Sequence, residues 1–291
     1  MKDIQEKKVN KIIELMLSGG LGNQMFEYAC ARSQQLDYGG EIVINTSLYE
    51  SDRYGRQFSL ERLNISQSIK VINKKRPIVR LLGGLGDKFP IVVYDFCSLF
   101  GYYIWRKRYF HSINCNNNKN VLYGYFQTHQ FFEKHDETIK RELKIKEKER
   151  AINTEVLKEI FNSNSVCVHV RRGDYVAEKL ITCDIPYYQR AIEMIQRRIT
   201  NPKFFVFSDD IEWVMNNLVI ENAVYVDNDN QDYEELQLMY SCKHFIICNS
   251  SFSWWAQYLS ESKEKVVVAP STWVPGETTQ NDIFQDDWIM L

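Results

Sequence analysis

Two adjacent arginines give the chain its clearest chemical signal. Arg171 and Arg172 follow a valine-rich run typical of a buried strand, and His169, Gly173 and Asp174 flank them. At a strand end, neighbouring side chains point in roughly opposite directions, so one arginine can face a ligand while the other braces the loop. Arginine stays charged and binds phosphate through paired N–H groups. We therefore expect this segment to bind an anionic group, although an ion-paired surface loop would use the same residues.

A glycine-rich turn near the N-terminus is a second candidate site. Gly20, Gly22, Asn23 and Gln24 lie between a short apolar strand and a helical pattern. Glycine lets the backbone approach a ligand closely, and a helix N-terminus offers free N–H groups to an anion or a sugar hydroxyl. The spacing is not G-x-G-x-x-G, so a dinucleotide fingerprint is not predicted. A purely structural turn would explain the glycines equally well.

A pair of aspartates, Asp209 and Asp210, follows the apolar run FFVF. Either carboxylate can cap the helix that comes next. An aspartate at this point can equally bind the N1–H and N2–H₂ edge of guanine, or ribose hydroxyls. The sequence leaves both alternatives open.

A hydroxyl-rich turn follows the apolar run FIIC. It consists of Asn249, Ser250, Ser251, Phe252 and Ser253. Hydroxyl groups and the free N–H groups of a helix N-terminus can together hold a phosphate without a lysine. This turn is therefore a second candidate for binding an anion.

A regular alternation of strands and helices must position these four clusters. In the C-terminal half, short apolar runs predict buried parallel strands at residues 166–170, 204–207, 224–226, 245–248 and 266–269. Helical patterns lie between them at residues 186–199, 211–218, 233–241 and 252–260. The alternation predicts an α/β fold with a doubly wound parallel sheet. Ligands of such sheets bind at the carboxyl ends of the strands, where all four clusters fall.

The N-terminal half also opens with a strand, a helix and a strand, at residues 15–17, 23–36 and 41–44. Residues 50–120 give no clear pattern. Charged residues dominate 140–150, which suits a solvated helix face or a linker. Together with the length of the chain, this predicts two domains, residues 1–150 and 151–291.

Composition narrows the function classes. With 36 basic and 38 acidic residues the net charge is -2, which gives no reason to expect a nucleic acid partner. The seven cysteines form no C-x-x-C pair and no zinc-type cluster, so we expect reduced core cysteines. The most apolar stretch, 89–105, is shorter than the ~20 residues of a spanning helix, and we expect it in the core. No signal peptide or anchor is evident, so we expect a cytoplasmic protein rather than a Golgi-type transferase.

The four clusters, in this order, resemble the α-1,2-fucosyltransferases of bacteria. The matching segments are SGGLGNQMFEYA, VCVHVRRGDY, VFSDD and NSSFSWW, and the resemblance runs from about residue 12 to residue 290. It implies a GT-B fold with two Rossmann-like domains facing a cleft. It also implies that L-fucose passes from GDP-β-L-fucose to the 2-hydroxyl of a terminal β-galactose, with inversion and without a metal or other cofactor. The acceptor would be an O-antigen, a capsule repeat or a lactose-type glycan.

The resemblance also implies roles for individual residues. Arg171 is expected to neutralise the diphosphate, and Asp209 or Asp210 to contact the nucleoside. The expected donor-binding residues are His169, Arg171, Arg172, Gly173, Asp209, Asp210, Asn249, Ser250, Ser251, Phe252 and Ser253. On the acceptor side we expect Gly20, Gly22, Asn23, Gln24, Tyr125, Phe126 and Gln127.

Four residues are the candidate catalytic groups. Loss of the sugar leaves extra negative charge on the diphosphate, and Arg171 can stabilise it in place of a metal. The acceptor hydroxyl must lose a proton, for which Asp174 and His169 are candidates. The neighbouring arginines make Asp174 a weaker base, and it can instead hold an arginine in place. Asn23 cannot take a proton but can orient a hydroxyl.

Two rival interpretations stay open. A metal-dependent GT-A transferase would use an Asp-x-Asp motif, which Asp227-Asn228-Asp229 matches, although such turns are common after strands. A non-catalytic carbohydrate-binding protein would stack sugars on exposed aromatic rings. The rings available for that are Tyr102, Tyr103, Trp105, Trp254 and Trp255.

Two basic runs flank apolar segments, Lys74-Lys75-Arg76 and Arg106-Lys107-Arg108. Lysine and arginine near apolar surface attract anionic lipid at about 1 kcal/mol each. A solvated basic surface would contain the same residues. We therefore expect at most peripheral contact with the inner membrane, where lipid-linked acceptors lie.

Overall fold

The computed structural model describes residues 11–66, 69–146, 154–226, 230–276 and 281–291. The chain forms two compact units. Unit 1 comprises the residues up to Gly19 together with Phe26–Phe58 and Ser66–Ile139, and unit 2 comprises Gly20–Met25, Ser59–Ile65 and Lys140–Leu291. The sequence did not predict that two short N-terminal segments join the C-terminal unit. The expected boundary at residue 150 lies outside the described residues, so that division stays a prediction.

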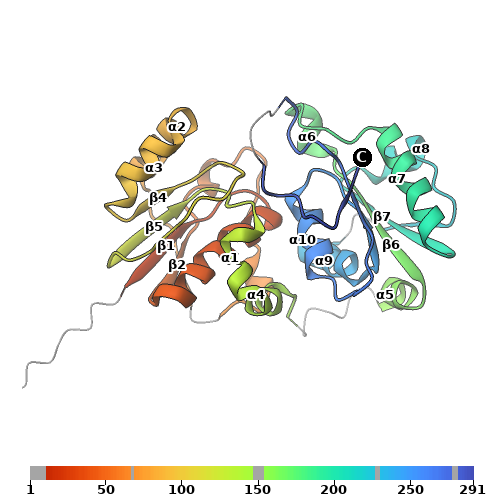
Figure 1. The fold of residues 1–291 in the computed structure, drawn as a ribbon, viewed down its shortest axis with the longest axis horizontal. Helices are drawn as coiled ribbons and strands as arrows, with labels where there is room; N and C mark the ends of the chain where they lie inside the picture. Colours follow the sequence, from red (N-terminus) through yellow and green to blue (C-terminus); the bar gives the residue numbers. More distant parts are fainter. Residues whose placement is uncertain (1–10, 67–68, 147–153, 227–229, 277–280) are drawn as a thin grey trace, which may run out of the picture. The chain divides into compact units, whose positions relative to one another are not determined.

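Unit 1 contains a five-stranded parallel sheet in the order β3-β2-β1-β5-β4. Its strands are β1 Ile12–Met16, β2 Glu41–Asn45, β3 Lys70–Ile72, β4 Tyr102–Ile104 and β5 Lys119–Tyr123. Its helices are α1 Leu21–Tyr38, whose first residues belong to unit 2, α2 Pro77–Lys88, α3 Pro90–Ser98 and the start of α4 Asp136–Leu143. Helix α1 covers one face of the sheet, and α2 with α3 the other (Figure 1). The predicted strand–helix–strand start is confirmed, and the unassigned middle supplies β3, α2, α3, β4 and β5.

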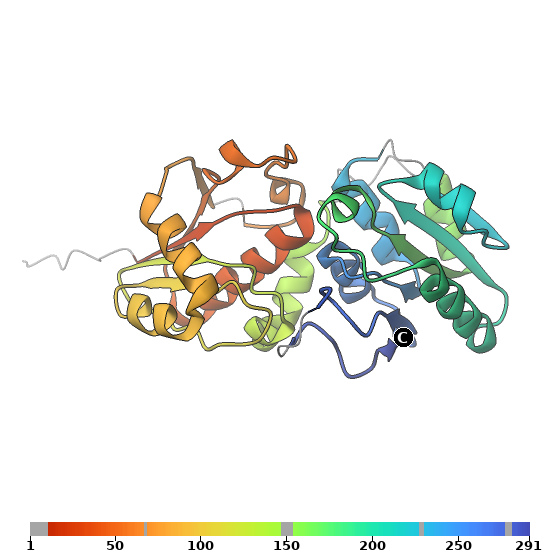
Figure 2. The same ribbon diagram turned by 90° about the horizontal axis from the view of Figure 1, so that it is seen from above.

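Unit 2 contains a six-stranded parallel sheet in the order β11-β10-β9-β6-β7-β8. Its strands are β6 Asn164–Val170, β7 Pro202–Ser208, β8 Ala223–Tyr225, β9 His244–Ile246, β10 Val267–Ala269 and β11 Ile289–Met290. Its helices are α5 Thr154–Phe161, α6 Gly173–Ala177, α7 Ile185–Arg198, α8 Ile211–Asn217, α9 Asp232–Ser241 and α10 Ser251–Leu259. Helices α7 and α8 lie on one face of the sheet and α9 and α10 on the other (Figures 1 and 2). The five strands and four helices predicted for this half are confirmed.

Strand order fixes where a ligand can bind in each unit. In unit 2 the chain moves outward from β6 through β7 to β8, then returns to the other side of β6 with β9. The carboxyl ends of β6 and β9 therefore border the switch point, where doubly wound sheets bind their ligands. In unit 1 the corresponding point lies between β1 and β5. Polar side chains follow the strand at each of these ends, so both points are candidate sites.

The expectation that residues 89–105 form core is wrong for part of the stretch. Tyr94, Cys97 and Trp105 are buried, but Val92 and Phe96 are 70% and 65% exposed. The apolar residues outnumber the positions that α3 can turn toward the sheet, so several face outward. None of the helices in the described part of the chain combines the length and hydropathy needed to span a bilayer.

Cysteines and large aromatic residues fill the core. All seven cysteines are buried and free of disulfides. Of the aromatic residues that could have formed a sugar-binding platform, Tyr103, Trp105, Trp254 and Trp255 are at most 3% exposed. A non-catalytic carbohydrate-binding protein would need such rings at its surface, so the structure disfavours that alternative.

Candidate functional site

Arg171 is held at the carboxyl end of β6 by two carboxylates. Its Nη2 and Nε lie 2.7 and 3.2 Å from Asp174 Oδ1, and its Nη1 lies 3.1 Å from Asp209 Oδ2. Burial alone would lower the pKa of Arg171, but Asp209 and Asp174 raise it above its ordinary value. A guanidinium has five N–H groups. These contacts therefore leave an N–H on each terminal nitrogen, and a fixed cation can still bind an oxyanion.

Arg172 has a bracing position instead. Its backbone N–H donates to Asp209 Oδ1 at 2.8 Å, and its Nε donates to Asp210 Oδ2 at 3.0 Å. Its guanidinium carbon lies 3.4 Å from the centre of the Trp213 ring, a stacked cation–π contact. Asp210 also caps α8 by accepting the N–H of Trp213 at 3.3 Å. Of the two aspartates, Asp210 is therefore the one that caps the following helix, α8, which was one of the two alternatives left open by the sequence.

Gly173 lets the arginine loop and the aspartate turn approach each other. A Cβ atom at this position would lie 2.4 Å from Asp209 Oδ2, closer than real contacts allow. Any side chain here would push Asp209 away from Arg171. The structure therefore brings together the second and third clusters that the sequence singled out.

The hydroxyl-rich turn follows β9, the neighbour of β6. Ser250 is the N-cap of α10 and accepts the N–H of Phe252 at 3.3 Å. The Asn249 side chain donates to the carbonyls of Leu180 and Trp273 at 2.8 and 2.9 Å, which fixes the turn. Ser253 points inward and is fully buried. The start of α10 thus lies at the switch point, at the carboxyl end of β9 and next to β6.

A tyrosine connects the arginine loop to this turn. The hydroxyl of Tyr175 on α6 donates to the carbonyl of Asn249 at 3.1 Å. The same ring lies under Arg171, whose guanidinium carbon is 5.6 Å from the ring centre. The cation and the start of α10 are therefore fixed relative to each other.

The glycine-rich turn meets the same helix start. The Ser251 hydroxyl donates to Asn23 Oδ1 at 2.8 Å, and Trp255 Nε1 donates to the Gly22 carbonyl at 3.0 Å. A Cβ on Gly22 would lie 2.5 Å from the backbone nitrogen of Phe252, so only glycine fits. Gly20 has open space around it instead, with no atom within 4 Å of such a Cβ. The first and fourth clusters, more than two hundred residues apart, are thus in direct contact.

His169 is buried behind the arginine loop. Its Nδ1 lies 3.2 Å from Cys248 Sγ, and its carbonyl accepts the Tyr188 hydroxyl at 3.1 Å. Burial, with the charge of Arg171, lowers the pKa of His169 to about 3. A neutral imidazole with so low a pKa is a poor proton acceptor near neutral pH. This environment favours a packing role over the catalytic role expected for His169.

Glu235, in the first turns of α9, is a site residue that sequence reasoning missed. Burial raises the pKa of its carboxyl to about 7, Arg171 opposes the shift, and Asp209 and Asp232 add to it. The sequence DYEEL is typical of an acidic helix start, so it does not single out this residue. The only available signal was that α9 delivers its first turns to the carboxyl ends of the strands. A carboxyl whose pKa is raised toward neutral pH is suited to accept a proton.

Unit 1 has a pocket of about 290 Å³ at its own switch point. Ser18 follows β1, Tyr125 follows β5, and Arg106 follows β4; all three line it, with Asp52 and Arg80. The Ser18 hydroxyl and N–H donate to the buried carboxyl of Glu27 at 2.6 and 2.9 Å. Arg106 stacks 5.7 Å from the Tyr125 ring centre. Hydroxyls, an aromatic face and cations suit a sugar.

Only part of the expected acceptor side is exposed to a ligand. Tyr125 lines the pocket, and its expected role in binding the acceptor stays a prediction. Phe126 is fully buried with a φ of 48°, and Gln127 is 7% exposed. Gln24 is fully buried and accepts the N–H of Ser59 at 2.9 Å. Strong burial gives Phe126, Gln127 and Gln24 supporting positions, because their side chains are turned into the core.

No metal-binding cluster is found among the described residues: nowhere there do three or more His, Cys, Asp or Glu side chains gather suitably. Asp227-Asn228-Asp229, the motif of the GT-A alternative, lies outside the described residues.

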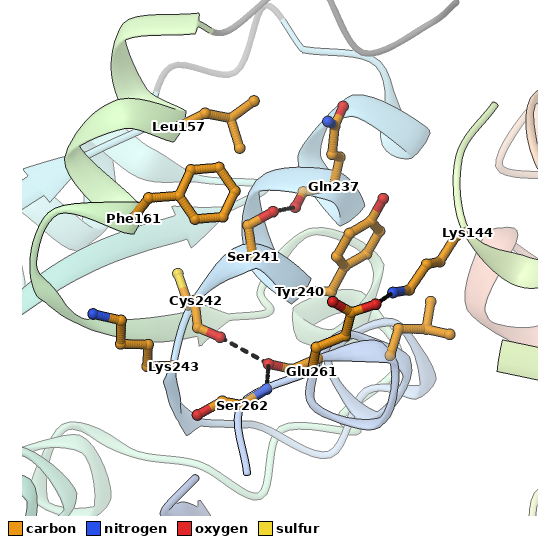
Figure 3. Close-up of a pocket in the computed structure, with 12 residues that line it drawn as sticks. Lys144, Leu157, Phe161, Gln237, Tyr240, Ser241, Cys242, Lys243, Glu261 and Ser262 are labelled. Atoms are coloured by element: carbon orange, nitrogen blue, oxygen red, sulfur yellow. Dashed lines mark hydrogen bonds and ion pairs between the residues drawn. The ribbon is translucent and has the colours of Figure 1, made fainter. Parts of the chain in front are cut away.

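Unit 2 also has a cavity, of about 610 Å³, which lies among α5, α9 and α10 (Figure 3). Leu157 and Phe161 form one wall, and Lys144 pairs with Glu261 at its edge. Lys243 lies directly before β9 and donates its N–H to Ser165 at the start of β6. The cavity therefore lies at the amino ends of the strands, away from the clusters described above.

Comparison with known proteins identifies relatives over most of the chain. The family model of glycosyl transferase family 11 matches residues 92–291. An α-1,2-colitosyltransferase of Escherichia coli is 31% identical, over 96% of this chain and 99% of its own length. The galactoside 2-α-L-fucosyltransferase Sec1 of Mus musculus is 32% identical over 107 residues, which is 34% of this chain and 29% of that protein.

Solved structures show the same fold. Fucosyltransferase NodZ from Bradyrhizobium has a TM-score of 0.56 and 15% identity, covering 86% of this chain and 93% of its own. A structure of NodZ α-1,6-fucosyltransferase soaked with GDP-fucose gives the same TM-score at 16% identity. The GT-B type of fold implied by the resemblance is confirmed.

Proposed function

The chain belongs to glycosyl transferase family 11, and from this membership we propose that it transfers L-fucose from GDP-β-L-fucose to the 2-hydroxyl of a terminal β-galactose. The observation that carries the proposal is the position of Arg171, fixed by Asp174 and Asp209 beside the start of α10. A guanidinium and a helix N-terminus at one switch point form a binding site for a diphosphate. The relatives named above include an α-1,2-colitosyltransferase and a galactoside 2-α-L-fucosyltransferase, which supports this donor class and linkage.

The proposed reaction is a single displacement. The acceptor oxygen attacks C1 of the sugar on the face opposite the diphosphate, the C1–O bond to phosphate breaks, and GDP leaves with both bonding electrons. Charge that develops on the leaving oxygen is stabilised by Arg171 and the N–H groups that open α10. With these donors in place, we expect no metal ion to be needed.

The acceptor hydroxyl loses its proton in the same step, and two carboxyl groups of unit 2 are candidates to take it. Asp174 already accepts two N–H groups of Arg171, which suits a positioning residue. Glu235 has a pKa of about 7, which matches proton transfer at neutral pH better. The pocket of unit 1, with Ser18 and Tyr125, is our proposed acceptor pocket.

A second donor deserves a direct comparison, because one full-length relative is a colitosyltransferase. Colitose is L-fucose without its 3-hydroxyl, so both sugars would reach the enzyme as GDP esters. A site that hydrogen-bonds the 3-hydroxyl would reject colitose strongly, whereas an apolar site would discriminate weakly.

The test is a donor panel: GDP-fucose, GDP-colitose, GDP-mannose and UDP-galactose, each with lactose as acceptor and with EDTA present or absent. We expect turnover with GDP-fucose that survives EDTA. Faster transfer from GDP-colitose would support the proposed binding site but would make GDP-colitose the preferred donor. Activity with UDP-galactose alone, or full loss with EDTA and rescue by Mn²⁺, would refute the proposal.

A further inference from the structure

Helices α2 and α3 pack side by side over one face of the unit 1 sheet (Figure 1). The buried residues of helix α2 are Val79 and two glycines, Gly83 and Gly86. A Cβ on Gly83 would lie 2.6 Å from the Tyr123 ring, so the helix backbone rests directly on the sheet. Leu82 is half-buried and packs against the core, and Ile78, Leu81 and Leu85 point elsewhere.

They point to solvent. Nine large apolar side chains of this helix pair and its flanks are between 43% and 73% exposed. They are Ile78, Leu81, Leu85, Phe89, Ile91, Val92, Phe96, Leu99 and Phe100, here called the apolar face. An ordinary surface helix has the opposite pattern, with its large apolar residues inward. An exposed group of this size marks an interaction surface.

The same segment carries a strong positive charge. Residues 69–110 contain nine lysines and arginines but only two acids, Asp87 and Asp95, a net charge of +7 in a chain of net charge -2. Lys74 and Lys75 precede α2, and Lys88 ends it. Arg106 pairs with Asp87 at 2.8 Å, and Lys107 donates to the Asp87 carbonyl at 3.2 Å, which adds two cations at the same helix end. Basic residues therefore lie at both ends of α2.

Some of this charge is already compensated. Arg76 forms a two-bond ion pair with the buried Glu14, and Lys75 lies 3.0 Å from Glu50. Lys74 and Lys88 remain exposed, and no ion pair of either with a carboxylate is found in the described part of the chain. They are the best single positions at which to change the charge.

We propose that the apolar face docks this protein onto an anionic lipid bilayer. Apolar side chains between clusters of lysine and arginine are the chemistry by which helices lie in a membrane interface. A second copy of the chain is a poorer occupant, because a symmetric dimer would bring two patches of the same positive charge together. An anionic surface complements both features of the apolar face.

Docking onto a bilayer would also bring the enzyme close to its acceptor. This part of the inference rests on the proposed function. Arg80 lies on α2 and lines the pocket of unit 1 proposed for the acceptor. A bilayer bound to α2 and α3 would keep that pocket at the membrane surface, where lipid-linked glycans are displayed.

Vesicle flotation with the full chain tests the proposal. The wild type should bind vesicles of phosphatidylcholine with a third phosphatidylglycerol, and bind pure phosphatidylcholine far less. Lys74→Gln with Lys88→Gln should lower the partition coefficient roughly 25-fold, since each basic residue contributes about fivefold. Val92→Asp with Phe96→Asp should lower it at least about tenfold.

A matched control removes exposed apolar residues elsewhere. Met215 and Val219 of unit 2 are 54% and 88% exposed, and Met215→Asp with Val219→Asp should leave vesicle binding unchanged. Equal loss in this control, or no binding of the wild type to anionic vesicles, would overturn the proposal. So would a wild type that is dimeric and becomes monomeric in Val92→Asp with Phe96→Asp, because a second copy would then cover the face.

The result is independent of the proposed function. Transfer to a water-soluble acceptor should be unchanged in Val92→Asp with Phe96→Asp, whereas transfer to a lipid-anchored acceptor in vesicles should fall at least tenfold. Vesicle binding without any transferase activity would keep the docking surface and refute the function alone.

Discussion

The proposed function depends most on the side chain of Arg171, because this cation is the group that we propose to stabilise the leaving diphosphate. Losing a charge-assisted, two-bond contact costs about 2–3 kcal/mol in the transition state. We predict that Arg171→Ala lowers kcat/KM about a hundredfold or more, and that Arg171→Lys recovers little because lysine lacks the planar fork. Arg197→Ala is the matched control, since its side chain is 79% exposed on α7 of the same unit. Near-normal turnover of folded Arg171→Ala would remove Arg171 from the mechanism.

A variant of Asp174 can show whether this residue positions Arg171 or acts as the general base. In the structure its Oδ1 accepts two N–H groups of Arg171, so its loss should let the guanidinium move. We predict that Asp174→Asn weakens both GDP affinity, by titration calorimetry, and transfer. Unchanged GDP affinity with lost transfer would make Asp174 the base instead. Full activity in both assays would give it neither role.

The raised pKa of Glu235 predicts that the stability of the folded protein depends on pH. The carboxyl has a pKa of about 7 in the folded protein against 4.5 in an unfolded chain, so the folded state holds its proton more tightly. This contribution to stability is complete below pH 4.5 and is lost as the pH rises to about 7. Glu235→Gln cannot ionise, so its melting temperature should gain on that of the wild type between pH 5 and pH 8. A constant difference across that range would show that Glu235 is not perturbed.

Site residues that belong to a recognisable motif could be predicted from the sequence. Site residues whose environment depends on tertiary packing could not. Arg171 follows an apolar run in the sequence, and its predicted position at the carboxyl end of a strand is confirmed by β6. Glu235 belongs to an ordinary acidic helix start in the sequence, and only its half-buried position, within electrostatic reach of Arg171, distinguishes it. The contact between Asn23 and Ser251 joins distant segments and follows from tertiary packing alone.

At the scale of elements, the meeting of α1 and α10 depends on one glycine. Gly22→Ala would place a Cβ within 2.5–2.8 Å of three backbone atoms of Ser251 and Phe252, so α10 must shift. We predict a loss of roughly 1–3 kcal/mol in the free energy of unfolding. Gly20→Ala, with open space around it, should change stability by less than about 0.5 kcal/mol. Equal stabilities of the two variants in urea denaturation would contradict the close approach.

The strands and helices of unit 2 followed from the sequence because buried parallel strands are continuous apolar runs, such as β6 and β7. Helices α2 and α3 could not be predicted in this way. Several of their large apolar residues face solvent, whereas sequence patterns assume that apolar residues are buried. The strand order, which defines each switch point, depends on pairings that a single sequence does not display.

At the scale of the whole molecule, each of the two parallel sheets has a candidate binding site of its own. The described residues place Arg171 and its two carboxylates at the switch point of unit 2, where we propose that the donor binds, and a pocket of about 290 Å³ at that of unit 1, where we propose that the acceptor binds. The positive segment around α2 sets unit 1 apart from the rest of an acidic chain. Donor, acceptor and membrane thus each have a surface of their own in the account proposed here.

The central claim is the transfer itself, and the structure of the product tests it most directly. The enzyme would be incubated with GDP-β-L-fucose and lactose, and the product examined by NMR. We predict an α-fucosyl residue, with a correlation from its anomeric proton to C2 of galactose, and about a hundredfold less of this product from Arg171→Ala at equal reaction time and amounts of enzyme that keep conversion low. A β-linked product, a bond to another hydroxyl of galactose, or equal product from Arg171→Ala would contradict it.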